Sequence, residues 1–327
     1  MGLVVISLFD GESGGMMALK RVGFEIDSYY ASEIEPNAID FSKRNFPEII
    51  HVGSVTDLKY ENGKLYTLDK VYDIPKVDLL LGGSPCQGFS RQGKHLNFED
   101  PRSMLFFEYV RILEEIKKEN PNVKFLLENV QMKKEWKELI DKSLDVDGID
   151  FNSDRLVPQN RPRTYWTNFN YELPIKTYSI LDLLDDVTLE DYEEIDGYKI
   201  CNSYSQDSKN LIQIVNGEVR IKQAVKIGYI VAENGDGINL SFPNSKTRRG
   251  RVVKGRSSCL DTSCNIGVLD GKNQIRPFTI NELCKLQTVD SELFNGYKEK
   301  DIKRMLGNGW TIDVIAYILK HIGGEQN

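Results

Sequence analysis

The first 130 residues alternate strand-like and helix-like runs, and this rhythm restricts the chain to a small set of folds. The strand-like runs are mostly apolar along their whole length, and the runs between them carry apolar residues at helical spacing. Strand-like runs lie at 3–9, 26–33, 77–83 and 123–130, and helix-like runs at 14–23, 35–46 and 103–119. Such strands must be covered on both faces, which is typical of parallel strands between helices. The sequence therefore predicts an α/β fold with a doubly wound, Rossmann-like parallel sheet.

The pattern changes after residue 169. The stretch 182–196 holds eight carboxylates and no base, and short irregular strands rich in Gly, Asn and Ser continue to about residue 270. Helical spacing returns from residue 276 onward. We therefore expect one domain formed by 1–169 plus 276–327, interrupted by a small second lobe at 170–275.

Charge is segregated along the chain. The net charge of −7 argues weakly against a protein that binds nucleic acid over its whole surface. However, residues 246–256 hold six bases and no acid, and glycines among them let a backbone come close to a phosphate. A contact with nucleic acid is favoured there over a merely solvated face.

The remaining composition excludes several classes of protein. Five cysteines form no C-x-x-C pair and only three histidines are present, so neither a disulfide framework nor a zinc site is indicated. No run approaches the roughly 18 apolar residues of a membrane span, and the N-terminal apolar run lacks the features of a signal peptide. We expect a cytoplasmic monomer without a metal.

Unusual loops follow the carboxyl ends of the strand-like runs, where ligands of such sheets bind. The first is "FDGESGG" (9–15), which is either a ligand loop or a plain turn before a helix. Glu33 ends the second run, at the place of a ribose-binding acid; alternatively, it is a favourable acid at a helix N-terminus. Together the two features favour contact with a nucleotide-like ligand.

Three further groups could carry chemistry. Cys86, in "SPCQ", is either a small buried thiol or a nucleophile with a lowered pKa on a loop at the ligand edge. Glu128 ends the apolar strand of "LLENV", as a cap or as an acid whose pKa burial would raise. Arg161 and Arg163 lie two residues apart in "QNRPR", so they point the same way if that segment is extended.

Taken in order, "FDGESGG", "SEI", "SPCQGFS", "ENV", "QNRPR" and "GNG" (307–309) resemble six successive motifs of the DNA (cytosine-5)-methyltransferases. The intervals are also similar to those of the family, with 42 residues from Cys86 to Glu128 and 35 from Glu128 to Arg163. The short second interval resembles the compact members, such as phage enzymes and the mammalian de novo type. The resemblance covers about 1–168 and 276–327, and it implies a methyltransferase sheet with an inserted target-recognition lobe.

The resemblance implies S-adenosylmethionine as cofactor. It places the cofactor contacts at Phe9, Asp10, Gly11, Gly14, Glu33, Ile34, Ser54, Val55, Pro85 and Asn308. An aromatic face such as that of Phe9 stabilises a sulfonium cation. One position departs from the family, which usually has an acid where this chain has Ser54. Whether Ser54 binds the adenine amino group, Asp57 replaces the acid or the contact is absent is left open by the sequence.

The resemblance also implies a mechanism on duplex DNA. Cys86 adds to C6 of a cytosine that has been flipped out of the helix, Glu128 holds the ring, and Arg163 with Arg161 orients base and acid. Contacts with the DNA are expected from Gln87, Ser90, Asn129, Arg248, Arg249 and Arg251. The recognition site should be short, and a cognate restriction endonuclease is a candidate partner.

Other functions fit less well. A zinc cytidine deaminase needs H-x-E and C-x-x-C motifs, and amino-methyltransferases have an Asn/Asp-Pro-Pro-aromatic loop where this chain has "SPCQ". The nearest rival is a relative that methylates cytosine C5 in transfer RNA. A catalytically silent DNA-binding module is disfavoured, because Cys86, Glu128 and Arg163 are all present.

Overall fold

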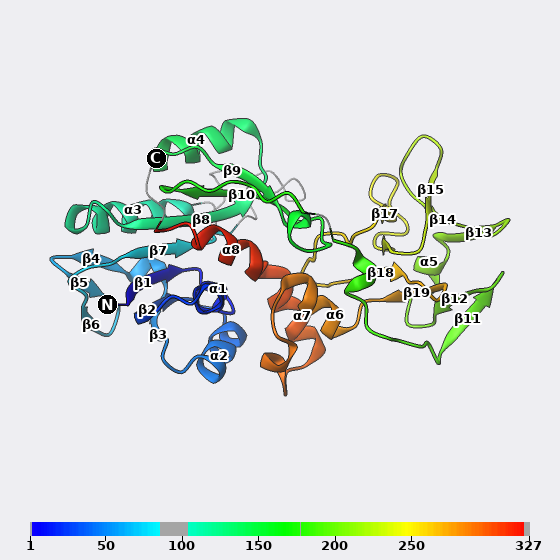
Figure 1. Ribbon diagram of the computed structural model, residues 1–327, viewed down its shortest axis with the longest axis horizontal. Helices are drawn as coiled ribbons and strands as arrows, with labels where there is room; N and C mark the ends of the chain where they lie inside the picture. The colour runs from blue at the N-terminus through cyan, green and yellow to red at the C-terminus, as the bar shows by residue number, and fades with distance from the viewer. Residues whose placement is uncertain (1, 86–103, 177, 324–327) are drawn as a thin grey trace. The chain divides into compact units, whose positions relative to one another are not determined.

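The computed structural model describes residues 2–85, 104–176 and 178–323. The chain divides into two compact units (Figure 1). The first comprises 1–151, 162–173 and 309–327, and the second comprises 152–161 and 174–308. None of the described helices is long and apolar enough to cross a membrane.

A seven-stranded sheet forms the centre of the first unit. Its strands are, in spatial order, β3 (Ile50–Gly53), β2 (Ile26–Ser32), β1 (Leu3–Leu8), β7 (Leu79–Gly82), β8 (Lys124–Val130), β10 (Pro162–Thr167) and β9 (Ile149–Asn152). The five strands from β3 to β8 run parallel, and β10 is antiparallel to β8. The predicted α/β class and doubly wound sheet are confirmed. Strand order reverses between β1 and β7, so a crevice for ligands is expected at their carboxyl ends.

Helices cover both faces of this sheet. They are α1 (Gly14–Val22), α2 (Pro36–Asn45), α3 (Leu105–Glu119), α4 (Lys134–Leu144) and α8 (Ile312–Leu319). Successive residues of β7 face opposite ways: Leu80 packs with Phe106 of α3, whereas Leu81 lies under Gly15 of α1. A Cβ at Gly15 would lie 2.6 Å from Leu81 Cδ1, so only glycine lets α1 approach this closely.

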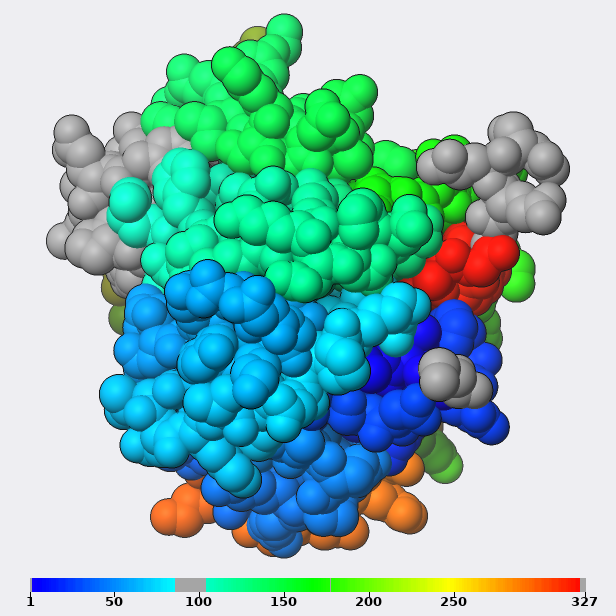
Figure 2. Space-filling view, turned by 90° about the vertical axis from the view of Figure 1, so that its left-hand side faces the viewer, coloured from blue at the N-terminus to red at the C-terminus, as the bar shows by residue number. Residues whose placement is uncertain are grey.

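A small meander lies beside α3 and was not predicted. It comprises β4 (Lys59–Glu61), β5 (Lys64–Tyr66) and β6 (Val71–Asp73), preceded by the short helix η1 (Val55–Asp57). Figure 2 shows it in light blue below the blue-green α3. Buried Tyr60 and Leu65 join the core beneath α3, so the meander extends the same hydrophobic layer.

The second unit is built on two antiparallel-rich sheets. Its six-stranded sheet has the order β11 (Tyr192–Ile195), β12 (Tyr198–Cys201), β19 (Gln274–Pro277), β18 (Ile266–Leu269), β16 (Asp236–Asn239) and β17 (Arg251–Val253). The three-stranded sheet is β13 (Ile212–Val215), β14 (Glu218–Lys222) and β15 (Tyr229–Ala232). The helices are η3 (Ser153–Arg155), η4 (Ile180–Asp182), α5 (Gln206–Lys209), α6 (Ile280–Gln287), η5 (Ser291–Phe294) and α7 (Glu299–Asn308). Ile200, Ile221, Ile238 and Ile275 lie in its core.

The boundaries of the two compact units differ from the domain boundaries expected from the sequence. The sequence groups 276–308 with the first 169 residues, whereas the structure packs this segment, with α6 and α7, into the second unit. A buried ion-pair network joins Arg276 of β19 to Asp270 and to Glu282 of α6. The chain rejoins the first unit at Gly309, and α8 then packs against α1.

Candidate active site

The loop after β1 is shaped by a buried carboxylate. Phe9, Gly11 and Ser13 all have positive φ, between 57° and 61°, so the chain turns sharply before α1. Asp10 anchors this turn from inside: its Oδ1 accepts from the Tyr29 hydroxyl and its Oδ2 from the Ser13 hydroxyl, both at 2.6 Å. Asp10 is 8% exposed, so its side chain shapes the loop from the interior of the protein.

Burial raises the pKa of Asp10 from 3.8 to about 6, and the hydrogen bonds from Ser13 and Tyr29 offset only part of this rise. The folded state therefore binds the proton more tightly than the unfolded state. Stability from this group is highest below pH 4, falls as the pH rises from about 4 to 6, and is level above that range. The predicted loss is on the order of 3 kcal/mol.

Asp10→Asn tests this titration, because the amide carries no charge at any of these pH values. The free energy of urea unfolding, measured from pH 4 to 7, should fall more steeply for the wild type than for the variant. A constant offset is expected as well, since the amide nitrogen cannot accept a hydrogen bond. Parallel curves would show that Asp10 does not titrate in this range.

Glu33 ties the end of β2 to the same loop. Its Oε2 accepts from Gly11 N at 2.8 Å, and its Oε1 accepts from Ile34 N and Glu35 N at 2.7 and 2.8 Å. A carboxylate oxygen has two lone pairs, so one acceptor site remains on Oε2. Ile34 is 72% exposed. A free acceptor next to an exposed apolar side chain fits the hydroxyls of a ribose and the face of a purine.

Ser54 begins the short helix η1. Its Oγ lies 2.8 Å from Thr56 Oγ1 and caps Thr56 N at 3.4 Å. Asp57 is exposed, with Thr56 Oγ1 3.5 Å from its Oδ1. The side chain of Val55 is buried in the core.

Glu128 is the centre of a polar cluster at the end of β8. Arg163 of the neighbouring β10 forms an ion pair with it, with 2.9 Å between Nε and Oε1. Trp310 Nε1 donates to the other oxygen, Oε2, at 3.0 Å. The side chains of Glu128 and Arg163 are 12% and 14% exposed, so the pair is largely shielded from water. Sequence reasoning did not identify Trp310; its only signal is its position directly after "GNG".

Two glycines explain the end of β7. A Cβ at Gly82 would lie 2.7 Å from the ring of Tyr109, so this glycine lets α3 pack onto the strand. A Cβ at Gly83 would lie 2.9 Å from Trp310 Nε1 and 3.2 Å from Glu128 Oε2. The strand end is therefore kept free of side chains where it meets the Glu128 cluster.

Asn129 fixes the segment that follows these glycines. It is 1% exposed, and its Nδ2 donates to the backbone oxygen and the hydroxyl of Ser84, at 3.2 and 3.1 Å. Ser84 is followed by Pro85, which is half-buried. Cys86, Gln87 and Ser90 lie outside the described residues.

Arg161 has different partners from Arg163. It is 4% exposed and donates to the carbonyls of Leu260 at 2.9 Å and Gly307 at 3.1 Å, all in the second unit. It therefore anchors the end of α7, where Asn308 is exposed. The two arginines were expected to point the same way if their segment were extended. The strand β10 begins only at Pro162, so strand alternation does not relate Arg161 to Arg163.

The basic run, 246–256, includes β17 and the residues on both sides of it. Arg248 stacks on the exposed ring of Phe242, with 4.6 Å between its guanidinium carbon and the ring centroid. Lys254 pairs with Asp236, and Arg256 pairs with Asp154. Within the described residues, Arg249 and Arg251 form no ion pair with a carboxylate. Cations without acidic partners remain available to a phosphate backbone.

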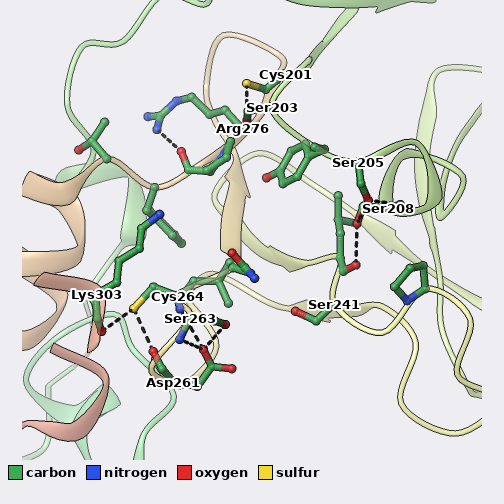
Figure 3. Close-up of a pocket in the computed structure, with 18 of the residues that line it drawn as sticks. Cys201, Ser203, Ser205, Ser208, Ser241, Asp261, Ser263, Cys264, Arg276 and Lys303 are labelled. Carbon is green, nitrogen blue, oxygen red and sulfur yellow. Dashed lines mark hydrogen bonds between the residues drawn. The ribbon is translucent and has the colours of Figure 1, made fainter. Parts of the chain in front are cut away.

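A separate pocket of about 840 Å³ lies within the second unit (Figure 3). It contains none of the predicted site residues. One of its lining groups is the thiol of Cys264, which donates to the carbonyl of Asp261 at 3.0 Å. Burial raises the pKa of Cys264 to about 12, and that of Cys284 likewise, so neither is a thiolate at neutral pH. Among the described residues, no three His, Cys, Asp or Glu side chains come together as metal ligands.

Comparisons with known proteins agree with this architecture. Among solved structures, the Entamoeba histolytica methyltransferase EhMeth aligns with a TM-score of 0.61 at 20% identity, and the Dnmt2 methyltransferase of S. pombe with 0.58 at 17%. Each alignment covers 98% of both chains. At these identities the likeness shows the shared fold.

The curated relatives include type II methyltransferases. M.NgoBV of Neisseria gonorrhoeae is 40% identical over 130 residues, which cover 38% of this chain and 27% of that protein. The chain thus matches about a quarter of that relative's length. M.HhaI of Haemophilus parahaemolyticus is 27% identical over 354 aligned positions, covering 100% of this chain and 96% of the relative. The profile of the C-5 cytosine-specific DNA methylases matches residues 3–324, and the chain therefore belongs to that family.

Proposed function

We propose that the protein transfers a methyl group from S-adenosylmethionine to C5 of cytosine in duplex DNA. The observation that carries this proposal is the shielded carboxylate of Glu128, held by Arg163 at the ligand edge of the sheet, at the end of the strand beside the one that leads to Cys86. Membership of the C-5 cytosine methylase family supports the reaction type.

The cofactor would be held where β1 and β2 end. Glu33 offers its remaining lone pair to a ribose hydroxyl, Ile34 offers an exposed apolar side chain to the adenine, and the left-handed turn at Gly11 lets backbone approach the ligand. Phe9 provides an aromatic face toward the cationic end. When bound, the cofactor supplies an electrophilic methyl group. The family resemblance assigns a further cofactor contact to Asn308, the last residue of α7.

Cytosine C5 is too weak a nucleophile to take a methyl group unaided. In the proposed mechanism the thiolate of Cys86 adds to C6, and Glu128 gives a proton to ring N3 as the adduct forms. C5 would then take the methyl group as the bond between that group and the cofactor sulfur breaks, leaving the electron pair on that sulfur. C5 would lose its proton to a base as the bond between the Cys86 sulfur and C6 breaks to release the thiolate, and N3 would return its proton to Glu128. Arg163 keeps the carboxyl in place for these steps. Extruding the base costs about a few kcal/mol, which contacts in the pocket offset.

Covalent trapping tests the mechanism directly. Duplex DNA containing 5-fluorocytosine, incubated with the protein and S-adenosylmethionine, should give a complex that survives denaturing electrophoresis, because fluorine cannot leave as a proton does. Cys86→Ser should bind the DNA without forming this complex. Ordinary duplex DNA and transfer RNA, compared as methyl acceptors with labelled cofactor, separate the two substrates. No covalent complex with the wild type on either nucleic acid would remove the mechanism.

The basic run should supply phosphate contacts. We expect the double variant Arg249→Ala/Arg251→Ala to bind duplex DNA more weakly, with a plot of log Kd against log salt shallower by about 2. The matched control is Arg220→Ala/Lys272→Ala, which removes two bases that already pair with Glu218 and Asp186. Titrations at several salt concentrations measure both slopes. If the wild type and Arg249→Ala/Arg251→Ala show the same salt slope, the basic run is a solvated surface that does not contact the DNA phosphates.

A further inference from the structure

Trp310 contacts a catalytic candidate that lies far from it in the sequence. It follows "GNG" directly and precedes α8, yet its indole nitrogen donates to Glu128 Oε2 at 3.0 Å, across 182 positions of sequence. All of these residues belong to the first unit. Trp310 itself is not among the predicted site residues and has no role in the mechanism proposed above.

Two glycines lie next to the indole ring of Trp310. A Cβ at Gly83 would lie 2.9 Å from Trp310 Nε1, and a Cβ at Gly14 would lie 3.4 Å from Trp310 Cε3. Gly14 is the first residue of α1, and Gly83 follows the last residue of β7. The space beside the hydrogen bond to Glu128 therefore admits no added side chain at Gly83, whereas a Cβ at Gly14 would make an ordinary van der Waals contact with the ring.

Glu128 is thus oriented by two donors that lie 147 positions apart in the sequence. Arg163 pairs with Oε1 and Trp310 with Oε2, so rotation of the carboxyl group would break at least one of the contacts. Each oxygen has two lone pairs, which leaves one on each oxygen for a base. A carboxyl that must meet both N3 and the amino group of cytosine requires such a fixed plane.

We propose that Trp310 is a positioning residue that acts through Glu128. This inference rests on the proposed function. It assigns to Trp310 two separable contacts: ring packing against α1 and β7, and a hydrogen bond that fixes the acid. The second contact should affect attack on the cytosine ring and leave cofactor binding nearly unchanged.

Trp310→Phe separates the contacts, because phenylalanine keeps an aromatic ring but has no N–H. Addition of the thiolate to C6 makes the C5 hydrogen exchangeable, so release of tritium from [5-³H]cytosine in duplex DNA reports attack without any methyl donor. We expect exchange to slow about 10- to 100-fold. Affinity for S-adenosylhomocysteine, measured by calorimetry, should change less than about 3-fold, since ring packing is retained. Trp136→Phe, on α4, is the matched control and should leave both quantities unchanged.

A double-mutant cycle identifies the route of the effect. If Trp310 acts through Glu128, Trp310→Phe should have little further effect on exchange in a Glu128→Gln background. Gly83→Ala provides a second variant if Trp310→Phe folds poorly, because its methyl carbon would lie 2.9 Å from Trp310 Nε1 and 3.2 Å from Glu128 Oε2 and would displace the donor or the acceptor; exchange should slow in the same direction.

Three outcomes would overturn the inference while leaving the proposed function standing. The first is a folded Trp310→Phe variant that exchanges tritium at the wild-type rate. The second is a loss of cofactor affinity as large as the loss of exchange rate, and the third is that the effects of Trp310→Phe and Glu128→Gln on the exchange rate are fully additive. A wild-type protein that neither exchanges nor methylates cytosine would instead remove the proposed function.

Discussion

Replacing Glu128 with glutamine should slow methyl transfer by about 10³-fold, while the protein remains folded. Glutamine has nearly the shape of glutamate, and its oxygen can still accept a hydrogen bond. However, it cannot give a proton to ring N3, and it loses the ion pair with Arg163, which joins the two groups at 2.9 Å in a largely shielded site. Both losses act on the charge that develops as the ring is attacked. Single-turnover transfer from labelled cofactor to duplex DNA measures the rate.

The matched control for this substitution is Glu138→Gln. Glu138 lies on α4, is 61% exposed and pairs with Lys134 at 3.4 Å. An exposed pair of this kind contributes little, so both activity and thermal midpoint should stay close to the wild type. A Glu128→Gln rate within tenfold of the wild type, in a variant of unchanged stability, would show that this carboxyl is not the acid of the reaction.

The pairing of Glu128 with Arg163 illustrates what the sequence can predict. The apolar run before Glu128 predicts a buried strand, and β8 indeed runs from Lys124 to Val130. The resemblance places an arginine 35 residues further on, and the antiparallel pairing of β10 with β8 sets Arg163 opposite Val130, close enough to reach Glu128. Local pattern and motif order are sufficient here because both residues lie on neighbouring strands.

Trp310 and Arg161 show where sequence reasoning ends. A single tryptophan after "GNG" has no periodicity, and its partner is 182 positions away. Arg161 belongs to the same short motif as Arg163, yet it binds the carbonyls of Leu260 and Gly307. Such contacts depend on which loops tertiary packing brings together, and backbone carbonyls carry no sequence signal. The meander β4–β6 was missed for a related reason, since its three-residue strands are too short to show alternation.

Replacing Arg276 with leucine should lower the free energy of unfolding by about 3–5 kcal/mol. The guanidinium is 2% exposed; it meets both oxygens of Glu282 at 2.9 and 2.8 Å and Asp270 Oδ2 at 3.1 Å. Leucine would leave two buried carboxylates without a counter-charge. Since the net stability of a domain is only about 5–15 kcal/mol, the second unit of the variant should unfold at a markedly lower urea concentration than that of the wild type. Urea titrations followed by circular dichroism measure the shift.

Arg220→Leu serves as the control, because Arg220 pairs with Glu218 at the surface, and it should leave the free energy of unfolding close to that of the wild type. Adding Glu282→Gln to Arg276→Leu should recover part of the loss, since a neutral amide is buried more cheaply than an unpaired carboxylate and its oxygen can still accept from Thr279 N. If the double variant is as unstable as Arg276→Leu, the stranded charge of Glu282 does not cause the effect. The free energy of unfolding of Arg276→Leu could instead lie within 1 kcal/mol of the wild-type value. In that case the network does not hold β19 to α6, and only apolar contacts join 276–308 to the second unit.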